Sequence, residues 1–89
     1  MLRLKLTKDA GEFLAKRQLK HQRQIAAKIQ TLRDDPAPTD SKALKGYDGY
    51  MRSDIGEYRV IYRVDGDTLF VATIGKRNDD EVYRRFKRK

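Results

Sequence analysis

Three consecutive runs of β-branched and aromatic residues, separated by short turn sequences, constrain the fold of this chain more than any other feature. The runs are Tyr50 to Ile55, Glu57 to Val64 and Thr68 to Lys76. Gly56 separates the first two runs, and Asp65-Gly66 separates the last two. Glycine and the Asp-Gly pair favour tight turns between strands, so the pattern predicts that these three segments form an antiparallel meander.

The second turn sets the register of the last two predicted strands. If Asp65-Gly66 forms the centre of a two-residue turn, Tyr62 lies opposite Leu69. The face that carries these two residues is apolar, so we expect helices to pack on it. The other face is predicted to carry Ile61, Phe70 and Ile74. That face is also too apolar to be left in water, so something must cover part of it.

The N-terminal part of the chain predicts one strand and two helices. Residues 2–6 alternate leucine with basic side chains, which is typical of a strand with one buried face. Thr7 is a suitable N-cap for a helix that buries Phe13. A second helix is predicted from about Gln18 to Asp34. The side of it that we expect to face the sheet carries Leu19, Gln22, Ile25, Ala26, Ile29 and Leu32.

The remaining segments predict a crossing loop and a final helix. Pro36 and Pro38 end the second helix, so residues 34–41 should form a loop. Asn78 to Glu81 resembles a capping box that opens a helix whose Val82 and Phe86 share one side. This helix is the candidate cover for the second face of the sheet. The predicted fold class is α+β, with a single-layer antiparallel sheet in one domain spanning residues 1–89.

The charge of the chain narrows its partners. Lysine and arginine number 21 against 13 acidic residues, which gives a formal net charge of +8. Such an excess favours polyanionic partners, such as RNA, DNA, acidic proteins or membrane surfaces. The sequence has no cysteine and one histidine, which excludes disulfides, thiolate nucleophiles and conventional zinc cages. We expect no metal, no other cofactor, no membrane span and a cytoplasmic location.

The residues needed by several hydrolase classes are missing or sit elsewhere. His21 lies in the middle of a predicted helix among basic residues, so a solvated surface histidine is a better interpretation than a Ser-His-Asp triad. Asp34-Asp35 and Asp79-Asp80 lie at predicted helix ends, where capping and dipole effects already explain them. Neither pair has the spread of carboxylates that a two-metal nuclease uses. What remains is a basic surface with tyrosines.

The first predicted turn gathers part of that basic surface. With Gly56-Glu57 at the centre of the turn, Asp54 lies opposite Arg59, and Arg52 shares their face of the sheet. The final helix must cross the same face to cover Ile61. Packing alone therefore predicts a pocket edged by Arg52, Arg59, Arg77, Tyr83 and Arg84.

Four segments together match a known family in order and spacing. They are Leu44-Lys45-Gly46, Gly56 to Tyr62, Ile74 to Arg77, and Glu81 to Tyr83. They resemble the RelE/ParE superfamily of bacterial toxins, and the resemblance spans essentially the whole chain. The GEYRVIY segment is shared by ribonuclease and gyrase-directed branches, so it implies the fold alone. The ending IGKRNDDEVYRR resembles the RelE ribonuclease branch, whereas ParE-type toxins usually lack this arginine and tyrosine pair.

The resemblance implies a function and a set of residues. The function is that of a toxin in a type II toxin-antitoxin system, which cleaves mRNA on the ribosome by 2′-OH attack and without a metal. An antitoxin would neutralise it, and the complex would bind operator DNA through the antitoxin. Arg59 matches the arginine that stabilises the phosphate, Arg77 the arginine that acts as acid or charge stabiliser, and Tyr83 the catalytic tyrosine. The further candidates for RNA binding are Lys45, Arg52, Lys76 and Arg84.

The sequence differs from that of RelE at one point, and it is compatible with two other functions. RelE carries two lysines on the strand before the GEYR segment, where this chain has one arginine and Asp54. Lys45 or Lys76 could replace those lysines. A ParE-type toxin that acts on DNA gyrase would share the fold, and so would a degenerate toxin kept as a binding module. Arg59 could also serve only to pair with Asp54 or Glu57.

Overall fold

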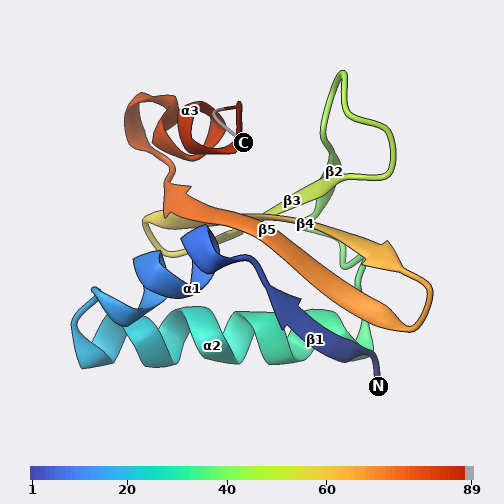
Figure 1. The fold of residues 1–89 in the computed structure, drawn as a ribbon, viewed down its shortest axis with the longest axis horizontal. Coiled ribbons are helices and arrows are strands. Elements are labelled where there is room, and N and C mark those ends of the chain that lie inside the picture. Colours follow the sequence, from blue (N-terminus) through green and yellow to red (C-terminus); the bar gives the residue numbers. More distant parts are fainter. Residues whose placement is uncertain (88–89) are drawn as a thin grey trace.

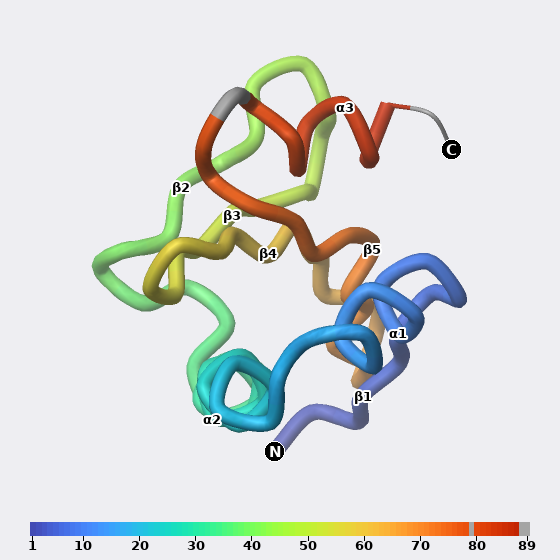
Figure 2. The backbone as a smooth tube through the Cα atoms, turned by 90° about the vertical axis from the view of Figure 1, so that its left-hand side faces the viewer, coloured from blue at the N-terminus to red at the C-terminus, as the bar shows by residue number. Residues whose placement is uncertain are grey.

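The computed structural model describes residues 1–87, apart from the side chain of Asp79. In chain order, the elements are β1 (Arg3–Leu6), α1 (Lys8–Ala15), α2 (Leu19–Asp34), β2 (Lys42–Ala43), β3 (Met51–Ile55), β4 (Tyr58–Asp65), β5 (Thr68–Lys76), a turn of 3-10 helix (Asn78–Asp80) and α3 (Glu81–Lys87). The five strands form one sheet in the order β1-β5-β4-β3-β2. Figures 1 and 2 show α1 and α2 on one side of this sheet and α3 on the other.

The predicted α+β class, the helical hairpin, the meander and the final helix are all confirmed. The sheet differs from the prediction in two ways. β1 pairs with β5 in parallel, with Leu4 opposite Leu69, so the sheet is mixed rather than antiparallel. β2 extends it beyond β3 and was not predicted. Alternation in a sequence indicates which face of a strand is buried, but not whether the strand runs parallel or antiparallel to its neighbour. β2 was missed because its two residues, Lys42 and Ala43, are exposed and carry no strand pattern.

The main core lies between the helices and the sheet. Ile25, Ile29 and Leu32 of α2 are buried there, but the predicted inward positions Leu19 and Ala26 are exposed, Leu19 by 59%. An α-helix turns by about 100° per residue, which puts both residues roughly 100° or more from the centre of the buried stripe. Leu4, predicted to be buried with its neighbours, is 37% exposed on an edge strand.

The turn between β4 and β5 is centred one residue later than predicted. Asp65 pairs with Thr68, so Gly66 and Asp67 are the two central residues. Gly66 has a φ of 62°, and glycine in this conformation at the first central position is what a type II′ turn requires. Consequently Tyr62 lies opposite Val71 rather than Leu69.

A β-bulge at Ala72 then changes which face the end of β5 presents. Tyr62 pairs with Val71, whereas Ile61 pairs with Thr73, so Ala72 is the extra residue. Its carbonyl accepts a hydrogen bond of 2.7 Å from the Thr7 hydroxyl. Beyond the bulge, Ile74 turns into the core under the helices, so its predicted position on the other face is wrong.

The second face of the sheet is covered by α3, as predicted. Ile61 is fully buried in a small cluster with Leu44 and Val82, and Phe70 is half-buried. Gly75 makes the close approach of α3 possible, because a Cβ atom at this position would lie 2.9 Å from the Cα atom of Val82. The absence of a side chain at one position of β5 thus sets how closely α3 sits on the sheet.

The predicted helix caps are half right. Thr7 caps α1 by accepting a 3.1 Å hydrogen bond from the backbone N–H of Ala10. Glu81 reaches back from the start of α3, but its carboxylate accepts from the backbone N–H of Lys76 at 2.8 Å, and not from that of Asn78 as a capping box would have it. None of the helices within residues 1–87 is long and apolar enough to cross a membrane.

Candidate active site

Arg59 of β4 forms the centre of a polar cluster beneath α3. Its Nε donates to Oδ1 of Asp54 at 2.5 Å, and its Nη2 donates to Oδ2 at 3.1 Å. Its Nη1 donates to the Tyr83 hydroxyl at 2.7 Å. The Arg59 side chain is 16% exposed, so these partners hold a largely buried guanidinium in one orientation.

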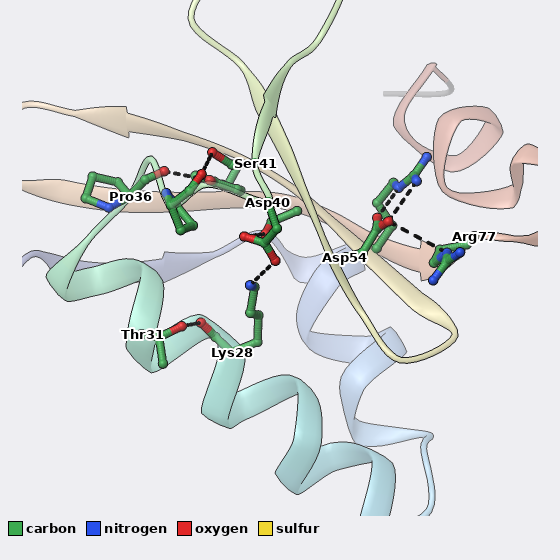
Figure 3. Close-up of polar contacts among 11 residues, drawn as sticks. Lys28, Thr31, Pro36, Asp40, Ser41, Asp54 and Arg77 are labelled. Carbon is green, nitrogen blue, oxygen red and sulfur yellow. Dashed lines mark hydrogen bonds and ion pairs between the residues drawn. The ribbon is translucent and has the colours of Figure 1, made fainter.

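Arg77, just after β5, is held beside the same carboxylate. Its Nε lies 3.8 Å from Oδ2 of Asp54. Figure 3 draws this ion pair as a dashed line. Its Nη1 donates to the carbonyl of Gly56 at 3.0 Å, and its backbone N–H donates to the carbonyl of Glu57 at 3.0 Å. The turn between β3 and β4 therefore positions Arg77, whose side chain remains 48% exposed.

Tyr83 reaches this cluster from the first half of α3. Its ring packs against the small apolar cluster formed by Leu44, Ile61 and Val82. The guanidinium carbon of Arg59 lies 5.6 Å from the centroid of the Tyr83 ring. A second contact ties α3 to α1, because Arg85 forms a 2.8 Å ion pair with Asp9. Apolar packing and an ion pair to another helix thus position the Tyr83 hydroxyl.

The charges in the cluster reinforce one another. The hydrogen bonds from Arg59 hold the pKa of Asp54 below its ordinary value; partial burial works against this effect, and the positive charges of Arg59, Arg77 and Arg52 add to it. In turn, the hydrogen bond with Asp54 raises the pKa of Arg59. Asp54 is therefore a carboxylate at neutral pH, and one negative charge stands among arginines that together remain cationic.

Comparison with known proteins agrees with this fold. The family model for the ParE toxin of type II toxin-antitoxin systems, parDE, matches residues 4–81. The chain belongs to the ParE toxin family. The predicted membership of the RelE/ParE superfamily is confirmed, and the protein is a type II toxin with a RelE-like fold.

Solved structures similar to this ParE-family toxin include RelE toxins. The archaeal RelE-RelB complex from Pyrococcus horikoshii gives a TM-score of 0.76 at 25% identity over 88% of this chain and 97% of that chain. The isolated E. coli RelE toxin gives 0.76 at 21% identity over 99% of this chain and 97% of that chain. No protein with curated function matches the sequence.

The structure of this ParE-family toxin brings together only part of the predicted site. Arg59 contacts both Asp54 and Tyr83, and Arg77 approaches Asp54. The charge of Arg52 acts on the same carboxylate. The other predicted residues lie elsewhere. Lys45 is exposed in the loop after β2. Lys76 lines a cavity of about 410 Å³ beside α1, and Arg84 lines a neighbouring cavity of about 500 Å³ along α3.

Asp54 is the residue of this cluster to which the sequence analysis gave no catalytic role. Its position opposite Arg59 was predicted from the first turn and is confirmed. Pairing of Arg59 with Asp54 was predicted only as an alternative to a catalytic role, whereas in the structure Asp54 binds Arg59 through two nitrogens and also approaches Arg77. A carboxylate opposite an arginine in a predicted hairpin, on the face that a basic helix must cross, was the available signal.

Proposed function

We propose that this toxin is an endoribonuclease that cleaves mRNA on the ribosome, with Arg59, Arg77 and Tyr83 as its catalytic residues. The observation that carries the proposal is the 2.7 Å hydrogen bond between Arg59 and the Tyr83 hydroxyl. It joins a cation on a strand to a phenol on a helix, next to a second arginine. Cleavage of RNA requires a group that takes a proton and groups that neutralise a phosphate, and this cluster has both.

The proposed reaction is a transesterification within the RNA. The 2′-hydroxyl of a ribose gives its proton to a base, and its oxygen forms a bond to the adjacent phosphorus. The bond from phosphorus to the 5′-oxygen of the next nucleotide breaks, and that oxygen takes up a proton from solvent. The products carry a 2′,3′-cyclic phosphate and a 5′-hydroxyl. Negative charge grows on the phosphate oxygens, and preorganised cations stabilise it.

Each catalytic residue has a role that fits its contacts. Tyr83 is the proposed base, and Arg59 donates a hydrogen bond to the oxygen that would accept the proton. A guanidinium has five N–H donors, and Asp54 and Tyr83 occupy only some of those of Arg59, so others remain for phosphate oxygens. Arginine is a very weak acid, which makes charge stabilisation the role of Arg77.

The partners follow from the same proposal. The structures of RelE in complex with RelB support a cognate antitoxin as the partner that neutralises this chain. Operator DNA would then be bound only through the antitoxin. We propose that the chain acts in the cytoplasm as one domain of residues 1–89. The proposed RNA contacts outside the catalytic cluster are Lys45, Arg52, Lys76 and Arg84.

A second candidate function comes from the family model itself, which is that of the ParE toxin. In this alternative the chain acts on DNA gyrase and has no nuclease activity. The two functions make different demands on the polar cluster. A gyrase-directed toxin does not need a tyrosine hydroxyl against a buried arginine, whereas a ribonuclease that uses Tyr83 does.

Primer extension on cellular mRNA after expression of the toxin tests the proposal. Wild type should produce cuts at codon-dependent positions, and Arg59→Ala and Arg77→Ala should each reduce cutting by about 10²–10³-fold, which is typical for loss of a preorganised charge donor. Arg23→Ala is the control, because it removes an exposed arginine of α2 on the opposite side of the sheet. Uncut mRNA together with inhibited gyrase would support the ParE-type alternative instead.

A further inference from the structure

We propose that a groove between loop 44–50, β5 and α3 binds an unpaired base of the RNA strand whose phosphate lies at Arg59. This inference rests on the proposed function and identifies a second contact of its substrate. The groove has a volume of about 540 Å³, within the range of small-ligand sites. Its aromatic lining residues are Tyr47, Tyr50, Phe70 and Phe86.

The aromatic rings of the groove meet edge to face. The Tyr47 and Phe86 ring centroids lie 4.9 Å apart at an interplanar angle of 74°, and those of Tyr50 and Phe86 lie 5.1 Å apart at 65°. An edge-to-face contact uses the face of only one of its two rings. Tyr47 is also 38% exposed, which is a large exposure for an aromatic side chain. A flat ligand could therefore stack on these rings without taking the core apart.

Loop 44–50 is built to present its two tyrosines. The backbone N–H of Leu44 donates to the carbonyl of Tyr50, that of Tyr47 to the carbonyl of Leu44, and that of Tyr50 to the carbonyl of Tyr47. Gly46 and Gly49 adopt positive φ angles of 86° and 81°, which allow the loop to turn tightly. Backbone hydrogen bonds thus fix the positions of both tyrosines in the loop.

Cationic side chains flank the aromatic rings. The guanidinium carbon of Arg63 lies 4.8 Å from the ring centroid of Phe70 and 5.5 Å from that of Tyr50. Its side chain is 38% exposed, and its ion pair with Asp65 is a long one of 3.8 Å. Lys87 lines the groove from the end of α3. Aromatic faces for bases next to cations for the backbone are the combination that single-stranded RNA-binding surfaces use.

The groove and the candidate active site lie on the same face of the sheet. Arg59, Ile61 and Arg63 alternate along β4 and so share one face of the sheet, with Arg63 roughly 13 Å from Arg59 along the strand. On α3, Phe86 follows Tyr83 by three positions, which is less than one turn. Figure 1 shows loop 44–50 and α3 on the same side of the sheet. One RNA strand can therefore contact both places.

A second apolar groove on the opposite side of the sheet has a different chemistry. It lies between α1 and α2, and its lining includes Leu14, Leu19 and Ala26 but no aromatic side chain. Aliphatic side chains do not provide stacking faces for bases, and Tyr83 lies on α3, on the other side of the sheet. The contrast favours RNA as the occupant of the aromatic groove.

Binding of a short fluorescent single-stranded RNA to the purified full chain tests the inference. All variants are made in a Tyr83→Phe background, which should slow any cleavage during the titration. Tyr47→Ala should weaken binding on the order of 10- to 100-fold, which is typical for loss of one stacked base, and Tyr47→Phe should preserve it. Leu19→Ala is the control. It removes from the other groove an apolar side chain that is more exposed than Tyr47, and it should leave RNA binding unchanged.

A second RNA identifies the group that the groove recognises. The chain that retains Tyr47 should bind an RNA with abasic positions more weakly than the intact RNA. The Tyr47→Ala variant should bind the two RNAs equally well. Equal binding of both RNAs to the Tyr47-containing chain would overturn the inference. Loss of antitoxin binding by Tyr47→Ala, with RNA binding intact, would also overturn it and make the groove a protein contact.

The inference can fail while the proposed function survives, and the reverse is also true. If Tyr47→Ala binds RNA normally while Arg59→Ala still abolishes mRNA cuts in cells, the groove is not a base site and the ribonuclease stands. If wild type produces no cuts in cells, the ribonuclease proposal fails, whatever the RNA titration gives.

Discussion

The phenol oxygen of Tyr83 lies 2.7 Å from Nη1 of Arg59 and joins α3 to β4. The ring that carries this oxygen is held independently of the hydrogen bond, because it packs against the buried apolar cluster of Leu44, Ile61 and Val82. The hydroxyl can therefore be removed without displacing the ring. This separation of the chemistry from the packing makes Tyr83 the most informative position of the candidate active site.

We predict that Tyr83→Phe reduces mRNA cleavage by about 10²–10⁴-fold, since it removes the proposed base. The free energy of unfolding should fall by about 1.5–3 kcal/mol, because one hydrogen bond from a charged group is lost while the ring stays in its contacts. Primer extension measures the cleavage and denaturant unfolding measures the stability. Full toxicity of Tyr83→Phe, with no cuts by wild type, would contradict the ribonuclease mechanism.

Asp54 gives a prediction about pH. Its pKa is lowered in the folded state, so its interactions stabilise the protein above the unfolded-state pKa of about 3.8, and this stabilisation is lost as pH falls through the lower folded-state value. Asp54→Asn should therefore be less stable than wild type at pH 6–7, and the difference in the free energy of unfolding should shrink below about pH 4. Denaturant unfolding at a series of pH values measures this difference.

The control for this experiment is Asp48→Asn, which changes an exposed aspartate in loop 44–50. It removes the same charge but no bidentate contact to an arginine. A stability difference for Asp54→Asn that stays constant down to pH 2 would show that lost packing, and not the ionised carboxylate, is responsible. Because Asp54 orients Arg59, the Asp54→Asn variant should also cleave mRNA more slowly at neutral pH.

The residues of this cluster were predictable because they depend on the first turn. Counting back from Gly56-Glu57 gave the correct pairing of Asp54 with Arg59, since no bulge interrupts the pairing of β3 with β4. The need to cover Ile61 then gave the location of α3. What could not be predicted was the exact reach of Arg77, because it depends on backbone carbonyls of that turn that no side-chain pattern reveals.

The second hairpin was predicted less well, and both reasons are local. Asp65-Gly66 fits more than one turn type, and the chain uses the type that puts Gly66 first. The bulge at Ala72 then shifts the pairing again, which puts Gly75 opposite Arg59. It also puts Ile74 on the face of the sheet that α1 and α2 cover. A bulge of this kind leaves no clear signal in one sequence, because alanine fits either face of a sheet.

Gly75 yields a prediction that links packing to catalysis. Gly75→Ala should lower the free energy of unfolding by about 1–3 kcal/mol, because the new Cβ atom would lie 2.9 Å from the Cα atom of Val82. The resulting shift of α3 should move Tyr83 away from Arg59 and reduce mRNA cleavage. Thermal or denaturant unfolding and primer extension measure the two effects.

Gly11→Ala is the matched control for Gly75→Ala. Gly11 lies inside α1, and a Cβ atom there would meet nothing within 4 Å. Alanine should stabilise the protein by about 0.5–1 kcal/mol at this position, because it is the better helix former. If Gly75→Ala is as stable and as active as Gly11→Ala, the close approach of α3 to β5 does not determine the geometry of the site.

Salt dependence separates the phosphate contacts of the toxin from its other contacts with RNA. Each phosphate that is neutralised releases counterions, so the logarithm of the binding constant should fall linearly with the logarithm of salt concentration. Arg77→Ala removes a half-exposed cation of the candidate active site, so it should reduce the slope by about 0.7, the value for one phosphate contact on a single strand. Tyr83→Phe leaves all the cations of the site in place and should leave the slope unchanged. Titrations of purified toxin with single-stranded RNA at several salt concentrations give both slopes. If Arg77→Ala and Tyr83→Phe have the same slope as wild type, Arg77 does not contact a phosphate, and its proposed role in the reaction is wrong.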